Sequence, residues 1–156
     1  MHLVMLAIDP GNEFSAYVRY DAASSSLVQF GKLANDELLV RLPKMATDGH
    51  LAIEMIASYG MPVGREVFET CVWIGRFVER WNNAHTVVYR RDVKLHLCGQ
   101  ARAKDANVRQ ALLDRWGGKE VAVGKKAAPG PLYGVSADVW AALGVAVTWC
   151  DTRAAR

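Results

Sequence analysis

Three carboxylates stand at the ends of apolar segments in this chain. Asp9 closes an apolar run over residues 2–8 and is followed at once by a Pro-Gly-Asn turn. Glu54 comes near the end of a second apolar run, and Asp138 falls in the first turn of a third apolar segment. Carboxylate oxygens are the ligands that Mg²⁺ prefers. Together these acids form a candidate Mg²⁺ site, in which two hard cations about 4 Å apart would activate water and steady the leaving oxygen of a phosphodiester.

Each acid also has a purely structural explanation. Asp9 can simply begin an Asp-Pro-Gly turn. Glu54 can be a surface residue at the end of a strand, and an acid such as Asp138 is favoured at the start of a helix by the helix dipole. Taken singly, the three positions leave both interpretations open.

The elements that must position these acids follow from hydrophobic periodicity and from turn residues. Three strands joined by short polar turns predict an antiparallel meander, followed by helices and strands in alternation. We expect strands over 2–8, 14–20, 27–33, 50–55 and 86–90. We expect helices over 36–42, 64–81, 103–116 and 136–149. Asn35 would cap the first of these helices and Pro43 would stop it, and Ser136 would cap the last. Residues 117–135 are rich in Gly, Lys and Pro and predict a mobile basic loop. The pattern indicates an α/β fold with a mixed sheet covered by helices.

Length and composition agree with an ordinary globular protein. The chain has 156 residues, of which 51% are hydrophobic, so we expect one domain with a sizeable core. No run approaches the roughly 20 apolar residues of a membrane span. The first apolar run is too short for a signal peptide, so we expect a cytoplasmic protein. Three widely spaced cysteines indicate neither a disulfide framework nor a zinc site.

Charge is divided unevenly along the chain. Residues 1–85 carry 7 Lys and Arg against 10 Asp and Glu, whereas residues 86–156 carry 12 against 6. A basic half beside an acidic cluster suits a polyanionic ligand with a metal between them. A solvated basic surface without a ligand explains the same numbers.

The ordered set of motifs resembles the RuvC-type Holliday junction resolvases of the RNase H-like superfamily, most closely their phage-encoded members. The matching segments are residues 7–11 (AIDPG), 52–55 (AIEM), 91–94 (RDVK) followed by Cys98-Gly99, 103–112 (AKDANVRQAL) and 136–143 (SADVWAAL). They span nearly the whole chain in the family's order.

The resemblance implies an RNase H-like mixed five-stranded sheet flanked by helices, with residues 1–156 as a single nuclease domain. It implies a Mg²⁺-dependent, structure-selective endonuclease that acts as a homodimer on four-way DNA junctions, in the host cytoplasm if a phage encodes it. Asp9 would bridge two Mg²⁺ ions, for which Mn²⁺ can substitute, and Glu54 and Asp138 would complete the ligands. Lys104 would polarise or hold the scissile phosphate; its alternative is an exposed lysine paired with Asp105.

The chain departs from the family at one ligand. Such enzymes usually carry an Asp or His three residues before the last acid, and this chain has Val135 there. Asp105 is the nearest charged candidate for the fourth ligand, although it stands where the family tends to place lysine. Ser136 or a water could also fill the position. The departure bears on rate and metal preference more than on the class of reaction.

The resemblance also suggests residues that bind DNA. In the family an aromatic residue just after the second acid pries at the bases, and Tyr59 is the nearest candidate. We expect phosphate contacts from basic side chains of the second half, namely Arg102, Lys119, Lys125 and Lys126. The helix over 64–82 is more broadly apolar than one buried stripe requires and is a candidate dimer interface.

Other functions stay open at this point. An RNase H-type nuclease for RNA–DNA hybrids or flaps would use the same acids. A catalytically weak or inactive protein that binds branched DNA is favoured mildly by Val135. Actin-like ATPases share the opening strand and turn, but they need a far longer chain. The biological role, recombination or debranching of DNA before packaging, is not fixed by the residues.

Overall fold

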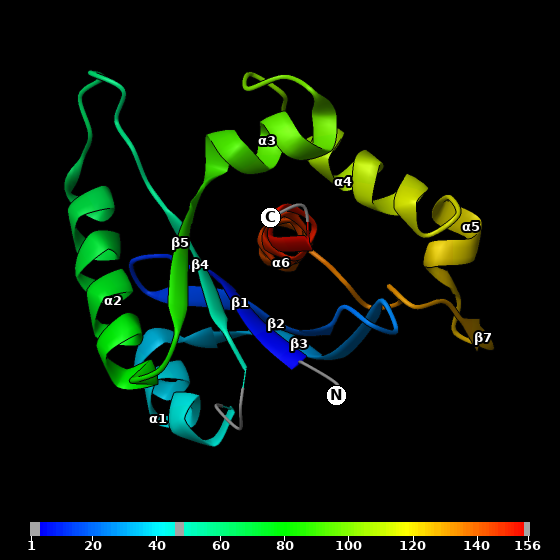
Figure 1. Ribbon diagram of the computed structural model, residues 1–156, viewed down its shortest axis with the longest axis horizontal. Helices are drawn as coiled ribbons and strands as arrows, with labels where there is room; N and C mark the ends of the chain where they lie inside the picture. Colours follow the sequence, from blue (N-terminus) through cyan, green and yellow to red (C-terminus); the bar gives the residue numbers. More distant parts are fainter. Residues whose placement is uncertain (1–3, 46–48, 155–156) are drawn as a thin grey trace.

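The computed structural model describes residues 4–45 and 49–154. Five strands, β1 Val4–Asp9, β2 Phe14–Asp21, β3 Ser26–Ala34, β4 Leu51–Met55 and β5 His85–Tyr89, form one sheet in the order β3-β2-β1-β4-β5 (Figure 1). The first three strands are antiparallel, and β4 and β5 continue the sheet parallel to β1. The predicted mixed five-stranded sheet is confirmed; positions 2 and 3 of its first strand lie outside the described residues.

Helices cover both faces of this sheet. Helices α1 Asn35–Met45 and α2 Arg65–Trp81 pack on one face, and α3 Arg90–Cys98, α4 Asp105–Arg115 and α6 Val139–Ala154 lie on the other (Figure 1). Each face has its own hydrophobic core. The alternation of side chains along a strand divides the residues between them: Met5 and Ala7 of β1 belong to the core under α6, and Leu6 and Ile8 to the core under α1 and α2.

Helix α6 runs through the middle of its layer. Figure 1 shows it end-on, between the sheet and the arc formed by α3 and α4. Its residues from Val139 to Trp149 are buried almost without exception. A helix that is apolar all round needs a neighbour on every side, and the sheet, α3 and α4 supply them. The start of α6 is therefore held firmly against the sheet.

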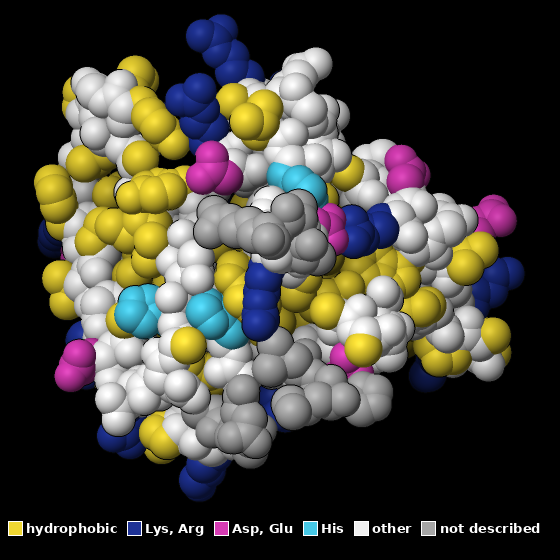
Figure 2. All heavy atoms as spheres, in the orientation of Figure 1, with side chains coloured by type: hydrophobic (Ala, Val, Ile, Leu, Met, Phe, Trp, Pro, Cys, Tyr) yellow, Lys and Arg dark blue, Asp and Glu magenta, His cyan; other side chains and the backbone are white. Residues whose placement is uncertain are grey.

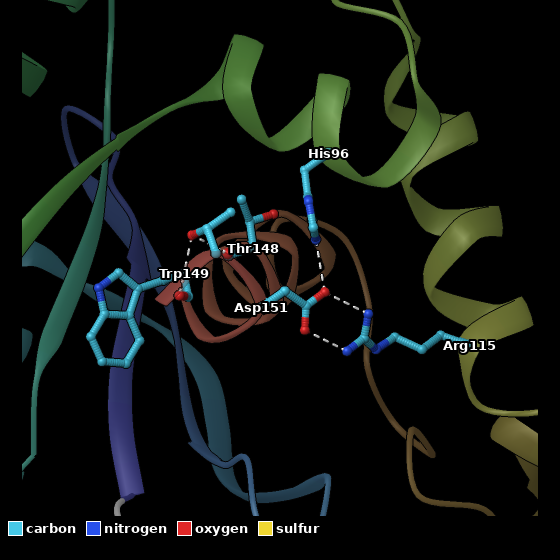
Figure 3. A network of polar contacts seen from close by, with 6 residues as sticks. His96, Arg115, Thr148, Trp149 and Asp151 are labelled. Atoms are coloured by element: carbon cyan, nitrogen blue, oxygen red, sulfur yellow. Dashed lines mark hydrogen bonds and ion pairs between the residues drawn. The ribbon is translucent and has the colours of Figure 1, made fainter. Parts of the chain in front are cut away.

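Polar contacts attach α3 and α4 to the far end of α6. The carboxylate of Asp151 accepts hydrogen bonds from both terminal nitrogens of Arg115 at 2.7 and 2.6 Å, and lies 2.7 Å from Nε2 of His96 (Figure 3). Arg115 holds the pKa of Asp151 below its usual range, despite a partial burial that acts in the other direction. Three helices thus meet at one carboxylate.

Two predicted helix boundaries are wrong. Helix α1 continues through Pro43 to Met45, and Asn35 is its first residue rather than its cap. Proline costs a helix one backbone hydrogen bond and causes crowding, but Pro43 lies exposed in the last turn, where Leu42 and Met45 gain from burial. Helix α3 begins at Arg90 and was not predicted, because its exposed, charged turns carry little hydrophobic periodicity.

The predicted mobile loop over 117–135 is also wrong. The segment forms a short helix, α5 Lys119–Ala122, and a two-stranded hairpin of β6 Gly124–Lys125 and β7 Ala128–Pro129. Three small or branched apolar side chains, Ala122, Leu132 and Val135, are buried in the core under α6. These anchors are too widely spaced to produce a periodic signal in the sequence.

Within residues 4–45 and 49–154, no helix combines the length and apolar character needed to cross a lipid bilayer. All three cysteines are free thiols.

Candidate active site

Alternation along neighbouring strands brings Asp9 and Glu54 together. The register pairs Ile8 with Ile53, so the next residues of β1 and β4 are also neighbours. Both point to the face covered by α6, because Ala7 and Ala52, two residues before them, lie in the core on that face. Both acids are buried, at 8% and 4% exposure. The predicted meeting of two strand-end carboxylates at one edge of the sheet is confirmed.

The turn after Asp9 is fixed by a small buried network. Asn35 donates a hydrogen bond from Nδ2 to the carbonyl of Gly11 at 2.8 Å and accepts one from the Ser15 hydroxyl at 2.6 Å. The Ser15 oxygen in turn accepts the backbone N–H of Gly11 at 3.1 Å. A Cβ atom at Gly11 would lie 2.4 Å from the carbonyl oxygen of Phe14, so only glycine fits. The network holds Asp9 at the end of its strand.

Removing Asn35 should loosen this turn. We expect Asn35→Ala to lower the free energy of unfolding by about 1–3 kcal/mol, because it leaves the partly buried carbonyl of Gly11 and the hydroxyl proton of the buried Ser15 without their partner. Urea denaturation followed by circular dichroism measures the change. Asp36→Ala, an exposed neighbour on the same helix, is the control and should change stability far less; equal losses for the two variants would contradict the role of Asn35.

Asp138 lies just before α6 rather than within its first turn, and Ser136 does not start the helix. Helix α6 begins at Val139, and the carbonyl of Asp138 accepts the backbone N–H of Ala142 at 3.1 Å. The carboxylate of Asp138 is exposed and accepts a hydrogen bond from Nζ of Lys32 at 2.6 Å. The positive φ of Ala137, 47°, marks the tight turn before the helix.

The two buried acids differ in their basic partners. Glu54 accepts a hydrogen bond at 2.9 Å from Nε of Arg90. Burial raises the pKa of Glu54, and Arg90 opposes that rise. Asp9 forms no such hydrogen bond with a described residue. Burial, assisted by the charge of Glu54 and then Asp138, raises the pKa of Asp9 from 3.8 to about 8, although Arg90 and Lys32 oppose the rise.

Two clefts open onto these acids and share Arg90. The smaller, of about 310 Å³, is lined by residues that include Asp9, Asp138, Asp105, Arg109 and Trp140. The larger, of about 660 Å³, contains Glu54 together with a set of basic and aromatic side chains, Arg91, Lys94, Arg102 and Tyr59. Arg90 lies at the boundary of the two. Burial alone would lower the pKa of Arg90, but the carboxylates of Glu54, Asp9 and Asp105 outweigh it and raise that pKa.

Three residues of the site were not predicted from the sequence: Arg90, Lys32 and Arg109. For Arg90 a signal was present: it follows Val88 by two residues, and Val88 lies in the core under α6. In the predicted strand over 86–90, the period of two places Arg90 on the face of Val88 and Glu54, although in the structure Arg90 is the first residue of α3. Lys32 had no comparable signal, because its approach to Asp138 joins residues 106 positions apart.

The predicted fourth ligand and the predicted lysine lie at the start of α4. Asp105 lines the smaller cleft, and its carboxylate is 3.7 Å from Nζ of Lys94. Lys104 precedes it as the cap of α4, where its backbone N–H donates to the side-chain oxygen of Asn107 at 2.9 Å. The pairing of Lys104 with Asp105 is not seen; Lys94 takes that place. Val135 is a buried core residue.

The residues predicted to bind DNA fall into two groups. Tyr59 and Arg102 both line the larger cleft, and the guanidinium of Arg91 lies 5.7 Å from the centre of the Tyr59 ring. Within the described residues, Lys119, Lys125 and Lys126 line neither cleft. They belong to α5 and the β6–β7 hairpin, at the opposite end of the molecule from α2 in Figure 1.

The carboxylates of the site suit a divalent cation in their chemistry, but they are not arranged as a complete coordination site. Among the described residues, no three His, Cys, Asp or Glu side chains converge as metal ligands. Asp9, Glu54 and Asp138 nevertheless supply only oxygens, as a hard cation requires, and burial together with the neighbouring Glu54 disfavours the charged form of Asp9 unless a cation lies beside it. Two of the three acids form ion pairs with basic side chains, Glu54 with Arg90 and Asp138 with Lys32.

The sequence matches no protein-family model and no curated protein. The solved structures that are similar to the chain include two of RuvC. The structure of Thermus thermophilus RuvC gives a TM-score of 0.64 at 14% identity, covering 94% of this chain and 92% of that one. T. thermophilus RuvC in complex with Holliday junction substrate gives 0.67 at 15% identity, covering 97% and 95%.

The comparison defines the fold. The chain has an RNase H-like fold, with a mixed sheet flanked by helices on both faces. More particularly, it has the RuvC-like form of that fold over nearly its whole length. The RuvC resemblance seen in the sequence motifs is confirmed at the level of fold.

Proposed function

We propose that this chain is a metal-dependent endonuclease that cuts branched DNA, including four-way junctions. The observation that carries the proposal is the pair of buried acids, Asp9 and Glu54, on adjacent strands beneath two clefts lined with arginine. The likeness to a RuvC captured with Holliday junction substrate supports it. The chemistry would reside in one nuclease domain.

Asp9, Glu54 and Asp138 would hold Mg²⁺ or Mn²⁺ in this proposal, with Asp105 the remaining acid of the smaller cleft. The bound metal would supply an activated water and neutralise charge on the phosphate that is cut. The protein's own contribution is to hold Asp9 through the Gly11 turn, to keep Glu54 out of solvent, and to surround both with cations that attract phosphate.

The larger cleft is the proposed entry for the DNA backbone. Arg91, Lys94 and Arg102 line it beside Glu54 and give it a positive surface for phosphates. Tyr59 is 62% exposed in the same cleft and offers a ring on which an unpaired base can stack. Duplex arms would bind by charge, and an unpaired junction centre would gain the stacking contact in addition.

Binding should therefore favour a junction over linear DNA. In EDTA, we expect a labelled four-way junction to bind at least about tenfold more tightly than linear duplex, from stacking and added phosphate contacts. Arg102→Ala should weaken binding and reduce the slope of log K against log salt by about one, the loss of one phosphate contact. Arg41→Ala, on the other face of the sheet, is the matched control. Equal affinity for junction and duplex would contradict junction selectivity.

A homodimer is part of the proposal. Figure 2 shows hydrophobic side chains gathered at the left of the molecule, over α2 and β5; the exposed large hydrophobic residues of these elements are Phe68, Val72, Val87 and Tyr89. Phe68 and Val72 are each 63% exposed and lie four residues apart on α2. An exposed apolar surface of this kind supports an interface between two copies of the chain.

We expect the wild-type protein to sediment as a dimer and Phe68→Glu/Val72→Glu to sediment as a monomer. Both side chains are exposed, so the substitutions should leave the core intact. Glu79→Gln, an exposed change on the same helix, is the control. A monomeric wild-type protein would contradict the dimer and leave the nuclease proposal standing.

The second candidate is a branched-DNA-binding protein with weak or no catalysis. It is favoured by the ion pairs that already occupy Glu54 and Asp138, and by Val135 at the fourth ligand position. The two candidates predict the same junction binding and differ in whether DNA is cut.

A further inference from the structure

Arg90 forms the most buried ion pair of the site. Its Nε lies 2.9 Å from Oε1 of Glu54, whose side chain is only 6% exposed, whereas the side chain of Arg90 is 54% exposed. The guanidinium lines both clefts and also acts electrostatically on Asp9 and Asp105. It therefore places a positive charge where a divalent cation would have to enter between the acids.

We propose that Arg90 is an exchangeable counter-cation, which neutralises Glu54 when no metal is bound and must leave Glu54 before a divalent cation binds there. This inference rests on the proposed function, since it takes Asp9 and Glu54 as metal ligands. In addition, a side chain of the protein itself, Arg90, would compete with the metal for Glu54.

The released guanidinium would have a partner when DNA is present. Arg90 lies at the boundary of the two clefts, where a phosphate of the bound strand would enter. Guanidinium binds phosphate with paired hydrogen bonds. The metal would bind Glu54 and the phosphate would bind Arg90, so that both residues of the ion pair would have a new partner. Metal binding and DNA binding would then favour one another, and such coupling is reciprocal.

The pair of Lys32 and Asp138 does not support the same role. Its Nζ–Oδ2 distance is 2.6 Å, but the two side chains are 45% and 52% exposed. Water can solvate both charges once they separate, so an exposed pair resists opening only weakly. Glu54 is far less accessible to water, because only 6% of its side chain is exposed. Competition with the metal is therefore concentrated at Arg90.

The test is the affinity of the full chain for Mn²⁺ without DNA, measured from the electron paramagnetic resonance signal of free Mn²⁺. We expect Arg90→Gln to bind Mn²⁺ at least about tenfold more tightly than the wild type, because one close positive charge is removed. Arg90→Lys keeps the charge and should stay near the wild-type affinity. Arg41→Gln breaks an exposed Arg–Glu pair of 2.6 Å on α1 and should change nothing.

The outcomes separate the inference from the proposed function. If the wild type binds Mn²⁺ and Arg90→Gln binds it equally or more weakly, Arg90 does not compete with the metal. The proposed metal site then still stands. Absence of Mn²⁺ binding in both proteins overturns the metal site and the inference together. Circular dichroism and thermal unfolding check the fold of each variant, and Arg90→Met, which also removes the charge, repeats the measurement if Arg90→Gln does not fold.

Discussion

Asp9→Asn should abolish DNA cutting while junction binding survives. The substitution keeps the size of the side chain but removes the charge of the acid that lies between Glu54 and the start of α6. Without it the remaining acids, each already paired with a base, would no longer hold the metal. We expect the rate of junction nicking in Mg²⁺ to fall at least about 10³-fold, equivalent to about 4 kcal/mol in the barrier.

The measurement is a single-turnover nicking assay, with junction affinity determined in parallel by gel shift. Glu13→Gln, an exposed acid that follows the Gly11 turn, is the matched control and should cut at the wild-type rate. Cutting by Asp9→Asn at more than a tenth of the wild-type rate would contradict the assignment of Asp9. Loss of binding together with cutting would mean that the substitution damages the fold or the DNA surface instead.

The same substitution should stabilise the metal-free protein at alkaline pH. In the folded chain the pKa of Asp9 is raised from 3.8 to about 8 by burial and by Glu54 and Asp138. The folded state therefore holds the proton more tightly than the unfolded state. The stability from this proton is fully present below about pH 4 and is lost as pH rises through about 8. The amide that replaces the carboxyl group in Asp9→Asn carries no charge at any pH, so this loss would disappear.

We expect Asp9→Asn to raise the free energy of unfolding by a few kcal/mol at pH 8.5 in EDTA, and by much less at pH 4.5. Urea denaturation at the two pH values measures both. Asp138→Asn is the control, because its exposed pair with Lys32 should be worth under about 1 kcal/mol. An equal effect of Asp9→Asn at both pH values, or a loss at pH 8.5, would contradict a buried, uncompensated charge at Asp9.

The sheet and the acid pair followed from the sequence because they rest on local signals. The strand that Asp9 closes and the strand that carries Glu54 have strong apolar patterns, and the Pro10-Gly11 turn marks where the first one ends. A period of two then fixes the face on which each acid lies. The motif order reinforced these signals, and the fold comparison confirmed the RuvC-like arrangement.

The parts that the sequence did not predict depend on contacts between distant segments. Leu132 and Val135 order the segment 117–135 by entering a core made by other elements, and Lys32 reaches Asp138 from across the sheet. Asn35 looked like a helix cap because its type and position suit one, yet its side chain holds the Gly11 turn instead. An origin in a phage and a place in the cytoplasm stay predictions.

The most direct test of the nuclease proposal is a nicking assay on an end-labelled four-way junction, with linear duplex as control, in Mg²⁺ and then in EDTA. We predict paired cuts near the crossover that require Mg²⁺, are absent on duplex, and disappear with Asp9→Asn. Tight junction binding without any cutting in Mg²⁺ or Mn²⁺ would contradict the nuclease and establish a branched-DNA-binding protein whose acids are held by Arg90 and Lys32.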